Sequence, residues 1–296
     1  MSTRKVLITG ATGDTGRAAT KESINRGLVV RAMVHRKDDR STALEKLGAE
    51  VVIGDLQEID TIREAMEGID AAYLVYPVQP GLINATVNFA QAAKESGVSA
   101  VINLSQRSAD RHSKSHSCRD HFIAEQVLNW SGLAVTHLRP TYFLEWLFYP
   151  WQLPLFLEKG VLRLPVGKGR HSPIGAEDQG RVIAALLQNP NEHAGQTYPL
   201  FGPVEMDHDQ MAIELSEALG RKIVFQNVTI DEYCQSLKML GVPDYVVQHL
   251  GGAMDAYQHG VMAGTNDNVE RLSGQKPTSV GVFARMHADR LNPKPR

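Results

Sequence analysis

Short apolar runs alternate with segments of helical periodicity along the first half of the chain. Residues 6–9, Val-Leu-Ile-Thr, form an apolar, β-branched run that predicts a buried strand. A glycine-rich turn follows, and residues 18–25 have the pattern of a helix that Arg26 and Gly27 close. The same unit then recurs. The further strands predicted are residues 29–34, 51–53, 71–75, 101–104 and 135–138, and the helices are residues 43–47, 59–66, 82–96 and 124–130.

Strands separated by helices in this rhythm require right-handed crossovers onto a parallel sheet. We therefore expect an α/β fold, a Rossmann-type doubly wound parallel sheet, over residues 1–140. After Pro140 the rhythm breaks, and residues 141–296 are expected to form a smaller α+β substrate region, intertwined with the sheet and not an independent domain. Ligands of such sheets bind at the carboxyl ends of the strands. In this second half the predicted helices are residues 182–187, 210–219 and 232–240, and the predicted strand is residues 223–225.

Composition excludes several classes of protein. The 296 residues are 43% hydrophobic and 22% charged, which argues against disorder, and the net charge of −2 argues against a protein that holds nucleic acid by a global positive field. No basic stripe with interleaved aromatic residues appears, so we expect no nucleic-acid partner. The two cysteines, Cys118 and Cys234, form no motif and indicate a reducing compartment. Without an apolar run of membrane-spanning length, we expect a cytoplasmic monomer or homodimer with no membrane partner.

The strongest motif is the glycine-rich turn between the first strand and the first helix. Glycine permits the sharp turn and lets the backbone approach a pyrophosphate, which the N–H groups of the helix N-terminus then bind. The spacing is GxxGxxG, one residue longer than the GxGxxG form, and a plain tight turn is the alternative. The residues expected to cradle the phosphates are Gly10, Thr12, Gly13, Asp14, Thr15 and Gly16.

The end of the second strand indicates which cofactor would bind. An acidic residue about 20 positions after the glycines binds the ribose of NAD, whereas an arginine there accommodates the extra phosphate of NADP. That position is Arg36, preceded by His35, while Asp38 and Asp39 lie slightly too far along and are interpreted as loop residues. We therefore expect NADPH, with contacts from His35 and Arg36. The alternative is a solvated basic turn.

Two further segments are expected to line the cofactor site. Asp55 follows the third strand and would contact the adenine together with Leu56, although an N-cap role for Asp55 is equally open. Tyr76 and Pro77 follow the fourth strand and would lie near the ribose, with core packing as the alternative for Tyr76.

With these residues identified, the chain resembles the NmrA-like, atypical group of the short-chain dehydrogenase/reductase superfamily, and the resemblance covers nearly the whole chain. It implies an NADPH-dependent reductase of quinones, azo dyes or triphenylmethane dyes, or else a non-catalytic regulator that senses the redox state of the cofactor. The matching segments are residues 9–16, 54–55, 131–133, 138–143, 177–178, 194–198, 202–203 and 264–267, and Phe283.

One departure from the wider superfamily bears on the chemistry. Its ordinary members use a Tyr-x-x-x-Lys pair as proton donor, but none of the eight tyrosines here has a lysine four residues later. The corresponding helix carries His121 and Glu125 instead, which resembles the quinone-reductase-like members. Reduction of an electron-poor acceptor does not require a strong acid held at a fixed position, so His121 or water could donate the proton. A purely structural pair of His121 with Glu125 is the alternative.

The same stretch contains a cluster that could suggest a metal. His112, His116 and Cys118 precede His121, but their spacing matches no standard zinc pattern and polar residues interleave as in a loop. No metal site is therefore expected.

The substrate region is expected where the fifth and sixth strands end. Ser105 would line the nicotinamide pocket, and the resemblance places Tyr142 and Phe143 beside the nicotinamide ring. Tyr142, Phe143, Trp146 and Tyr149 are the candidates for binding a flat aromatic substrate, with plain core or lid packing of the aromatic residues as the alternative.

Three functions remain open. The first is an NADPH-dependent reductase that transfers hydride to a flat aromatic acceptor, a quinone or an azo compound. The second is a non-catalytic NADP(H) sensor that binds a partner protein. A third, reduction of a phenylpropanoid-type double bond, would require a lysine near the nicotinamide, and Lys114 is the only nearby residue of that type.

Overall fold

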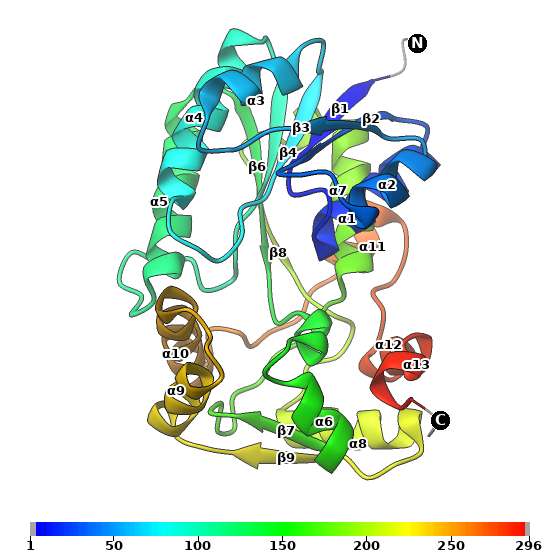
Figure 1. The fold of residues 1–296 in the computed structure, drawn as a ribbon, viewed down its shortest axis with the longest axis vertical. Helices are drawn as coiled ribbons and strands as arrows, with labels where there is room; N and C mark the ends of the chain where they lie inside the picture. The colour runs from blue at the N-terminus through cyan, green and yellow to red at the C-terminus, as the bar shows by residue number, and fades with distance from the viewer. Residues whose placement is uncertain (1–3, 294–296) are drawn as a thin grey trace.

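The computed structural model describes residues 4–293, and a seven-stranded sheet forms its centre. The strand order is β3-β2-β1-β4-β5-β6-β8, and every neighbouring pair is parallel. The Rossmann-type doubly wound fold expected from the sequence is therefore confirmed (Figure 1). The strands are β1 (Lys5–Ile8), β2 (Val29–Val34), β3 (Glu50–Ile53), β4 (Ala71–Leu74), β5 (Ala100–Leu104), β6 (Ala134–Pro140) and β8 (Thr197–Leu200).

Helices cover both faces of this sheet. On one face Val6 and Ile8 of β1 pack with α1 and α7, while on the other face Leu7 packs with α3, α4 and α5. Burial on both faces explains why the strands are continuous apolar runs. Helices α1 and α7 touch so closely that a Cβ on Gly180 would lie 2.6 Å from the backbone of Ala18. The helices are α1 (Asp14–Asn25), α2 (Asp39–Lys46), α3 (Ile59–Met66), α4 (Leu82–Glu95), α5 (His116–Trp130), α7 (Ala176–Gln188) and α11 (Asn268–Ser273).

Several helices begin earlier than the sequence pattern predicted. The prediction that Asp39 is a loop residue is wrong, because Asp39 is the first residue of α2; Asp38 does precede the helix, where it forms a capping box with Ser41. Helix α5 starts at His116 and not at residue 124, because the Ser115 hydroxyl accepts a hydrogen bond from the Cys118 N–H. Polar first turns hide a helix start from a search for apolar periodicity.

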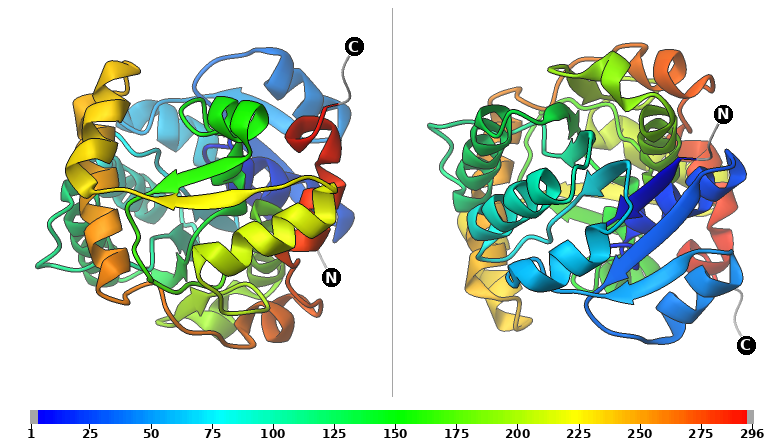
Figure 2. Two further views of the ribbon diagram at one scale, coloured as in Figure 1. Left: turned by 90° about the horizontal axis from the view of Figure 1, so that it is seen from below. Right: turned by 90° about the horizontal axis from the view of Figure 1, so that it is seen from above.

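A smaller region lies beyond the carboxyl ends of the strands, at the end of the molecule opposite to α3 (Figure 1). Its two parallel strands, β7 (Val161–Leu164) and β9 (Val224–Asn227), lie side by side when seen from below (Figure 2). Both β7 and the long helix α10 were missed in the sequence. The helices of this region are α6 (Leu153–Lys159), α8 (His208–Leu219), α9 (Ile230–Met239), α10 (Asp244–Gln258), α12 (Val280–Met286) and α13 (Ala288–Leu291).

The two halves of the chain interleave. Strand β8 and helices α7 and α11 come from the second half but pack on the large sheet, next to β6 and α1. The division at residues 140 and 141 remains a prediction, because the chain crosses between the two regions more than once. Within residues 4–293, none of the helices is both long enough and apolar enough to cross a membrane.

Candidate active site

A cavity of about 680 Å³ lies where the carboxyl edge of the large sheet meets the smaller region. The turns after β1, β4, β5 and β6 supply one wall, and α10 supplies the opposite one. The structure thus brings together segments from Gly10 to Met262, which are far apart in the sequence. The predicted site residues that line this cavity are Gly10, Thr12, Gly13, Asp14, Thr15, Tyr76, Pro77, Ser105, His121, Tyr142, Phe143, Trp146 and Tyr149.

The glycine-rich turn forms a tight cradle at the start of α1. Gly10 adopts a φ of +54°, and its carbonyl accepts a hydrogen bond of 2.9 Å from the Gly13 N–H. Gly13 occupies the N-cap position and has no side chain to cap the helix, so the first N–H groups of α1 stay open for a ligand. Gly16 does not line the cavity, but a Cβ there would lie 2.2 Å from the Gly10 carbonyl oxygen. The turn therefore fits the pyrophosphate of a dinucleotide, which needs open N–H groups and a backbone without side chains.

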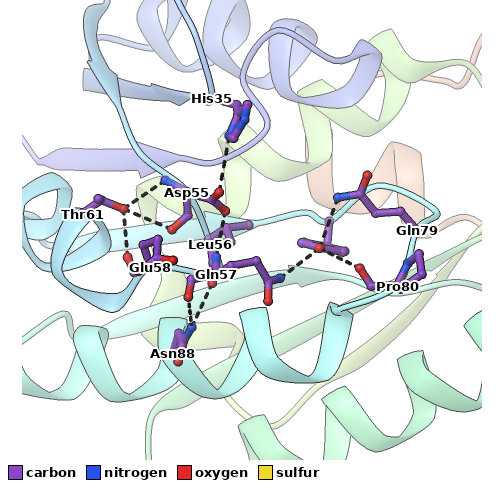
Figure 3. A network of polar contacts seen from close by, with 10 residues as sticks. His35, Asp55, Leu56, Gln57, Glu58, Thr61, Gln79, Pro80 and Asn88 are labelled. Atoms are coloured by element: carbon purple, nitrogen blue, oxygen red, sulfur yellow. Dashed lines mark hydrogen bonds and ion pairs between the residues drawn. The ribbon is translucent and has the colours of Figure 1, made fainter.

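The residues predicted to bind the adenosine end lie outside this cavity. His35 and Arg36 are exposed at the end of β2, and His35 Nδ1 lies 3.7 Å from Asp55 Oδ2. Asp55 accepts a hydrogen bond from the Gln57 N–H (Figure 3), and the N-cap of α3 is Glu58, so the alternative N-cap role of Asp55 is wrong. The Leu56 side chain is buried in the core on the α3–α4 face.

Arg40 is a cavity residue that the sequence did not reveal. It lies in the first turn of α2 and its guanidinium bonds to the Asp38 carboxylate at 2.6 Å. The Asp38 carboxylate also accepts N–H bonds from the first turn of α2, and the Arg40 bond lowers its pKa. Because Asp38 is committed to this helix end, its carboxylate is not free for a ribose hydroxyl, while His35, Arg36 and Lys37 at the end of β2 are exposed.

Tyr76 has a polar role in addition to its position in the cavity wall. Its hydroxyl donates to the Pro80 carbonyl at 3.0 Å and accepts from the amides of Gln57, at 2.9 Å, and Gln79, at 3.2 Å. Gln57 and Gln79 approach this point from opposite sides (Figure 3). Tyr76 therefore does more than pack in the core, because its hydroxyl connects the loop after β3 with the loop after β4 by hydrogen bonds.

His121 and Glu125 have different partners within the fold. Burial, aided by the nearby His249, lowers the pKa of His121 to about 4, so its ring is neutral at neutral pH. Glu125 Oε1 accepts a hydrogen bond of 2.8 Å from Arg139 Nε, and the second carboxylate oxygen bonds to the same guanidinium. Burial is the largest single influence on Glu125 and raises its pKa, but the hydrogen bonds from Arg139 and Ser105 and the charge of Arg139 together outweigh it, so the pKa is lowered. Among the described residues His121 and Glu125 form no ion pair, because the Glu125 carboxylate bonds to Arg139; that the two residues are purely structural remains a prediction.

Four buried rings cluster beside the cavity: Tyr142 and Tyr257 line it, and His171 and His208 pack against them outside its lining. Tyr142 stacks on His171 at 5.1 Å between ring centroids, and His171 lies 4.4 Å from His208 and 5.4 Å from Tyr257. Within the described part of the chain, the hydroxyls of both tyrosines and all ring nitrogens of both histidines lack hydrogen-bond partners. Burial lowers the pKa of His208 to about 3. Of these four residues, only Tyr142 was predicted as a site residue. His171, His208 and Tyr257 are far from Tyr142 in the sequence, so no local motif connects them to it.

The histidine and cysteine cluster around the start of α5 forms no metal site. Cys118 is buried and its thiol lies 3.2 Å from the Ser108 hydroxyl. In residues 4–293, no group of three or more His, Cys, Asp or Glu side chains is arranged to hold a metal ion.

The parallel sheet, the glycine turn and the cavity at the carboxyl edge define a protein of the Rossmann class. More specifically, the chain belongs to the NmrA-like family, which it matches over residues 2–281, so the resemblance noted in the sequence is confirmed. It is 27% identical to an NAD(P)H azoreductase from Xenophilus azovorans, over 283 residues that cover 96% of this chain and 98% of the relative.

Two solved structures show the same fold. An NADPH-dependent quinone oxidoreductase from Escherichia coli, solved in complex with NADPH, has a TM-score of 0.83 at 24% identity and covers 95% of this chain and 99% of its own. NmrA, a negative transcriptional regulator solved in complex with NAD, has a TM-score of 0.81 at 17% identity and covers 96% of this chain and 95% of its own.

Proposed function

We propose that this protein is an NADPH-dependent reductase that transfers hydride to a flat aromatic acceptor, a quinone or an azo compound. The observation that carries the proposal is the single cavity that runs from the phosphate cradle at Gly13 to the aromatic residues Tyr142 and Trp146. A dinucleotide on the cradle and a flat acceptor against the rings would share one enclosed space. The azoreductase and quinone oxidoreductase relatives support the same reading.

The residues of this chain would bind and orient the two reactants. The N–H groups at the start of α1 would hold the pyrophosphate, and Ser105, Tyr142 and Phe143 would line the place of the nicotinamide. NADPH, when bound, supplies the hydride. Wide aromatic walls from Trp146 and Tyr149 would keep water from the acceptor and hold its ring flat.

The electron count requires one proton per hydride. A quinone gains a hydride and a proton and becomes a hydroquinone, while an azo bond gains the same pair and becomes a hydrazine; NADPH leaves as NADP. A second hydride and proton would cleave the hydrazine to two amines. His121 is neutral at neutral pH, so we assign proton delivery to water and a hydrogen-bonding role to the His121 ring. Neither product needs an acid as strong as a Tyr-x-x-x-Lys pair.

Preference for NADPH over NADH rests on the basic tip of β2. The exposed Arg36 would bind the adenosine phosphate, and Arg40, which lines the cavity and is paired with Asp38, would exchange that pair for the phosphate. Guanidinium groups bind phosphate in a bidentate manner, whereas a ribose hydroxyl would call for a free carboxylate.

The test is the loss of NADPH absorbance in the presence of a panel of quinones and azo dyes, with NADH in parallel. The proposal expects loss that depends on acceptor and enzyme together and is faster with NADPH. No acceptor-dependent loss, combined with tight NADPH binding, would instead favour a cofactor-sensing regulator. That second function is kept because NmrA, a transcriptional regulator, has the same fold.

A further inference from the structure

A second cavity, of about 370 Å³, adjoins the first, and Arg107 and Ser108 line both. Arg107 lies on the segment that follows β5, where its backbone N–H donates to the Pro140 carbonyl at 3.0 Å. This bond fixes Arg107 beside the end of β6. The Arg107 side chain therefore stands at the junction between the proposed substrate pocket and the second cavity.

Both other cations that line the second cavity are paired with carboxylates, whereas Arg107 is not. Lys114 bonds to Asp255 at 2.8 Å, and Arg139 bonds to Glu125, which lies behind the cavity wall. The Asp110 carboxylate accepts the His112 N–H at 2.6 Å. For Arg107, by contrast, no carboxylate of the described residues lies within ion-pair distance, and its Nε is buried without a hydrogen-bond partner.

The surroundings of Arg107 are unfavourable for a lone cation. Burial, and after it the charge of Arg139, lower the pKa of Arg107. The Phe201 ring, 5.9 Å from the guanidinium carbon, offers only a weak cation–π contact. A partly buried guanidinium without an anion is costly to the fold, and its fork of donors matches the oxygens of a carboxylate or sulfonate. An anionic ligand would remove this cost.

We infer that the acceptor carries an acidic substituent, a carboxylate or a sulfonate, which binds Arg107 at the junction of the two cavities while the aromatic ring lies in the first. The inference rests on the proposed reductase function and narrows its substrate class from flat aromatics to anionic flat aromatics. The aromatic residues proposed to hold the ring, Tyr142, Phe143 and Trp146, carry no charge, so the acid would select the orientation of the acceptor.

Matched acceptors test this directly. Methyl orange carries a sulfonate, its para-carboxylated counterpart carries a carboxylate, and unsubstituted dimethylaminoazobenzene carries neither. The wild-type protein should show a KM at least about 10-fold lower for either acidic dye than for the neutral dye, the factor expected for one charge-assisted hydrogen-bonded pair. Equal KM values for all three dyes would overturn the inference.

Variants locate the effect. R107A should raise the KM of the acidic dyes about 10- to 100-fold and leave the neutral dye and the affinity for NADPH unchanged. R107K keeps the positive charge, so its KM for the acidic dyes should lie between those of the wild type and R107A. It also provides a test if R107A does not fold. The matched control is R111A, because Arg111 is exposed and outside both cavity linings. An equal effect of R107A on acidic and neutral dyes would overturn the assignment.

A binding titration separates this inference from the function on which it rests. Methyl orange is titrated into the protein saturated with NADP, and its absorbance change is compared between the wild type, R107A and R107K. If no dye is reduced but methyl orange binds and R107A weakens its binding more than R107K does, the reductase function fails and the anion site stands. If dyes are reduced but R107A binds methyl orange as tightly as the wild type, the anion site fails.

Discussion

The most specific structural prediction concerns Gly16, whose replacement by alanine would deform the phosphate cradle. A Cβ at this position lies 2.2 Å from the Gly10 carbonyl oxygen, 2.8 Å from the Gly10 carbonyl carbon and 2.9 Å from the Ala11 Cα. All three atoms belong to the backbone, so no side chain can rotate away. Ordinary contact begins at 3.4 Å, and the turn would have to open by about 1 Å.

The cost to cofactor binding follows from the hydrogen bonds that the cradle would donate. Hydrogen bonds to a charged group contribute about 1.5–3 kcal/mol each, and a displacement of about 1 Å breaks them. Loss of two such bonds to the pyrophosphate would weaken NADPH binding by about 3–6 kcal/mol, or roughly 100-fold at the least. We expect G16A to remain folded, since the turn lies at the surface of the cavity.

The measurement is the Kd for NADPH by fluorescence titration, with thermal unfolding followed in parallel. G281A is the matched control, because a Cβ on Gly281 of α12 meets its nearest atom at 3.5 Å and should change neither property. A folded G16A protein that binds NADPH within about threefold of the wild type would refute the assignment of this turn as the pyrophosphate site.

Three other outcomes are expected. R36A and R40A should each raise the KM for NADPH and leave that for NADH nearly unchanged; steady-state rates with both cofactors check this, and equal effects would contradict an adenosine-phosphate contact. Glu125→Gln leaves the Arg139 guanidinium without its carboxylate and should lower the free energy of unfolding by about 2–3 kcal/mol in urea denaturation; a loss below about 0.5 kcal/mol would show that solvent screens the pair. The pKa of His208 is about 3 when folded against 6.5 ordinarily, so below pH 6.5 the unfolded chain binds a proton that the fold excludes. Its contribution to stability is thus lost as the pH falls from 6.5 toward 3, by about 1.4 kcal/mol per pH unit, and H208L should show a shallower decline than the wild type in that window.

The parts of the site that could be predicted from sequence are local. The cradle from Gly10 to Gly16 is one strand, one turn and one helix start, so its residue order already specifies its shape. The six strands predicted in the first half are all present, because each contains a run of apolar residues, and all of them except the edge strand β3 are mostly buried. Strand β8 was missed because Thr197, Tyr198 and Pro199 at the sheet edge lack that apolar pattern.

The parts that could not be predicted depend on contacts between distant segments. His171 and His208 meet Tyr142 only because the smaller region folds over the sheet edge. The sequence likewise does not show that Arg107 lacks a carboxylate partner. Arg139 lies near Arg107 only because β5 pairs with β6, and the nearby Glu125 of α5 is already paired with Arg139. The four-residue spacing of His121 and Glu125 along the chain puts them on one helix face. It carries no information about Arg139 of β6, the residue that binds the Glu125 carboxylate.

The central claim is that hydride passes from NADPH to an aromatic acceptor in one cavity. The most direct measurement compares the rate of acceptor reduction with ordinary NADPH and with NADPH deuterated at the transferring position of the nicotinamide. The account predicts slower single-turnover reduction with the deuterated cofactor and deuterium lost from the nicotinamide at the rate at which the acceptor is consumed. Bound NADPH that keeps its deuterium through prolonged incubation with quinones and azo dyes would contradict it.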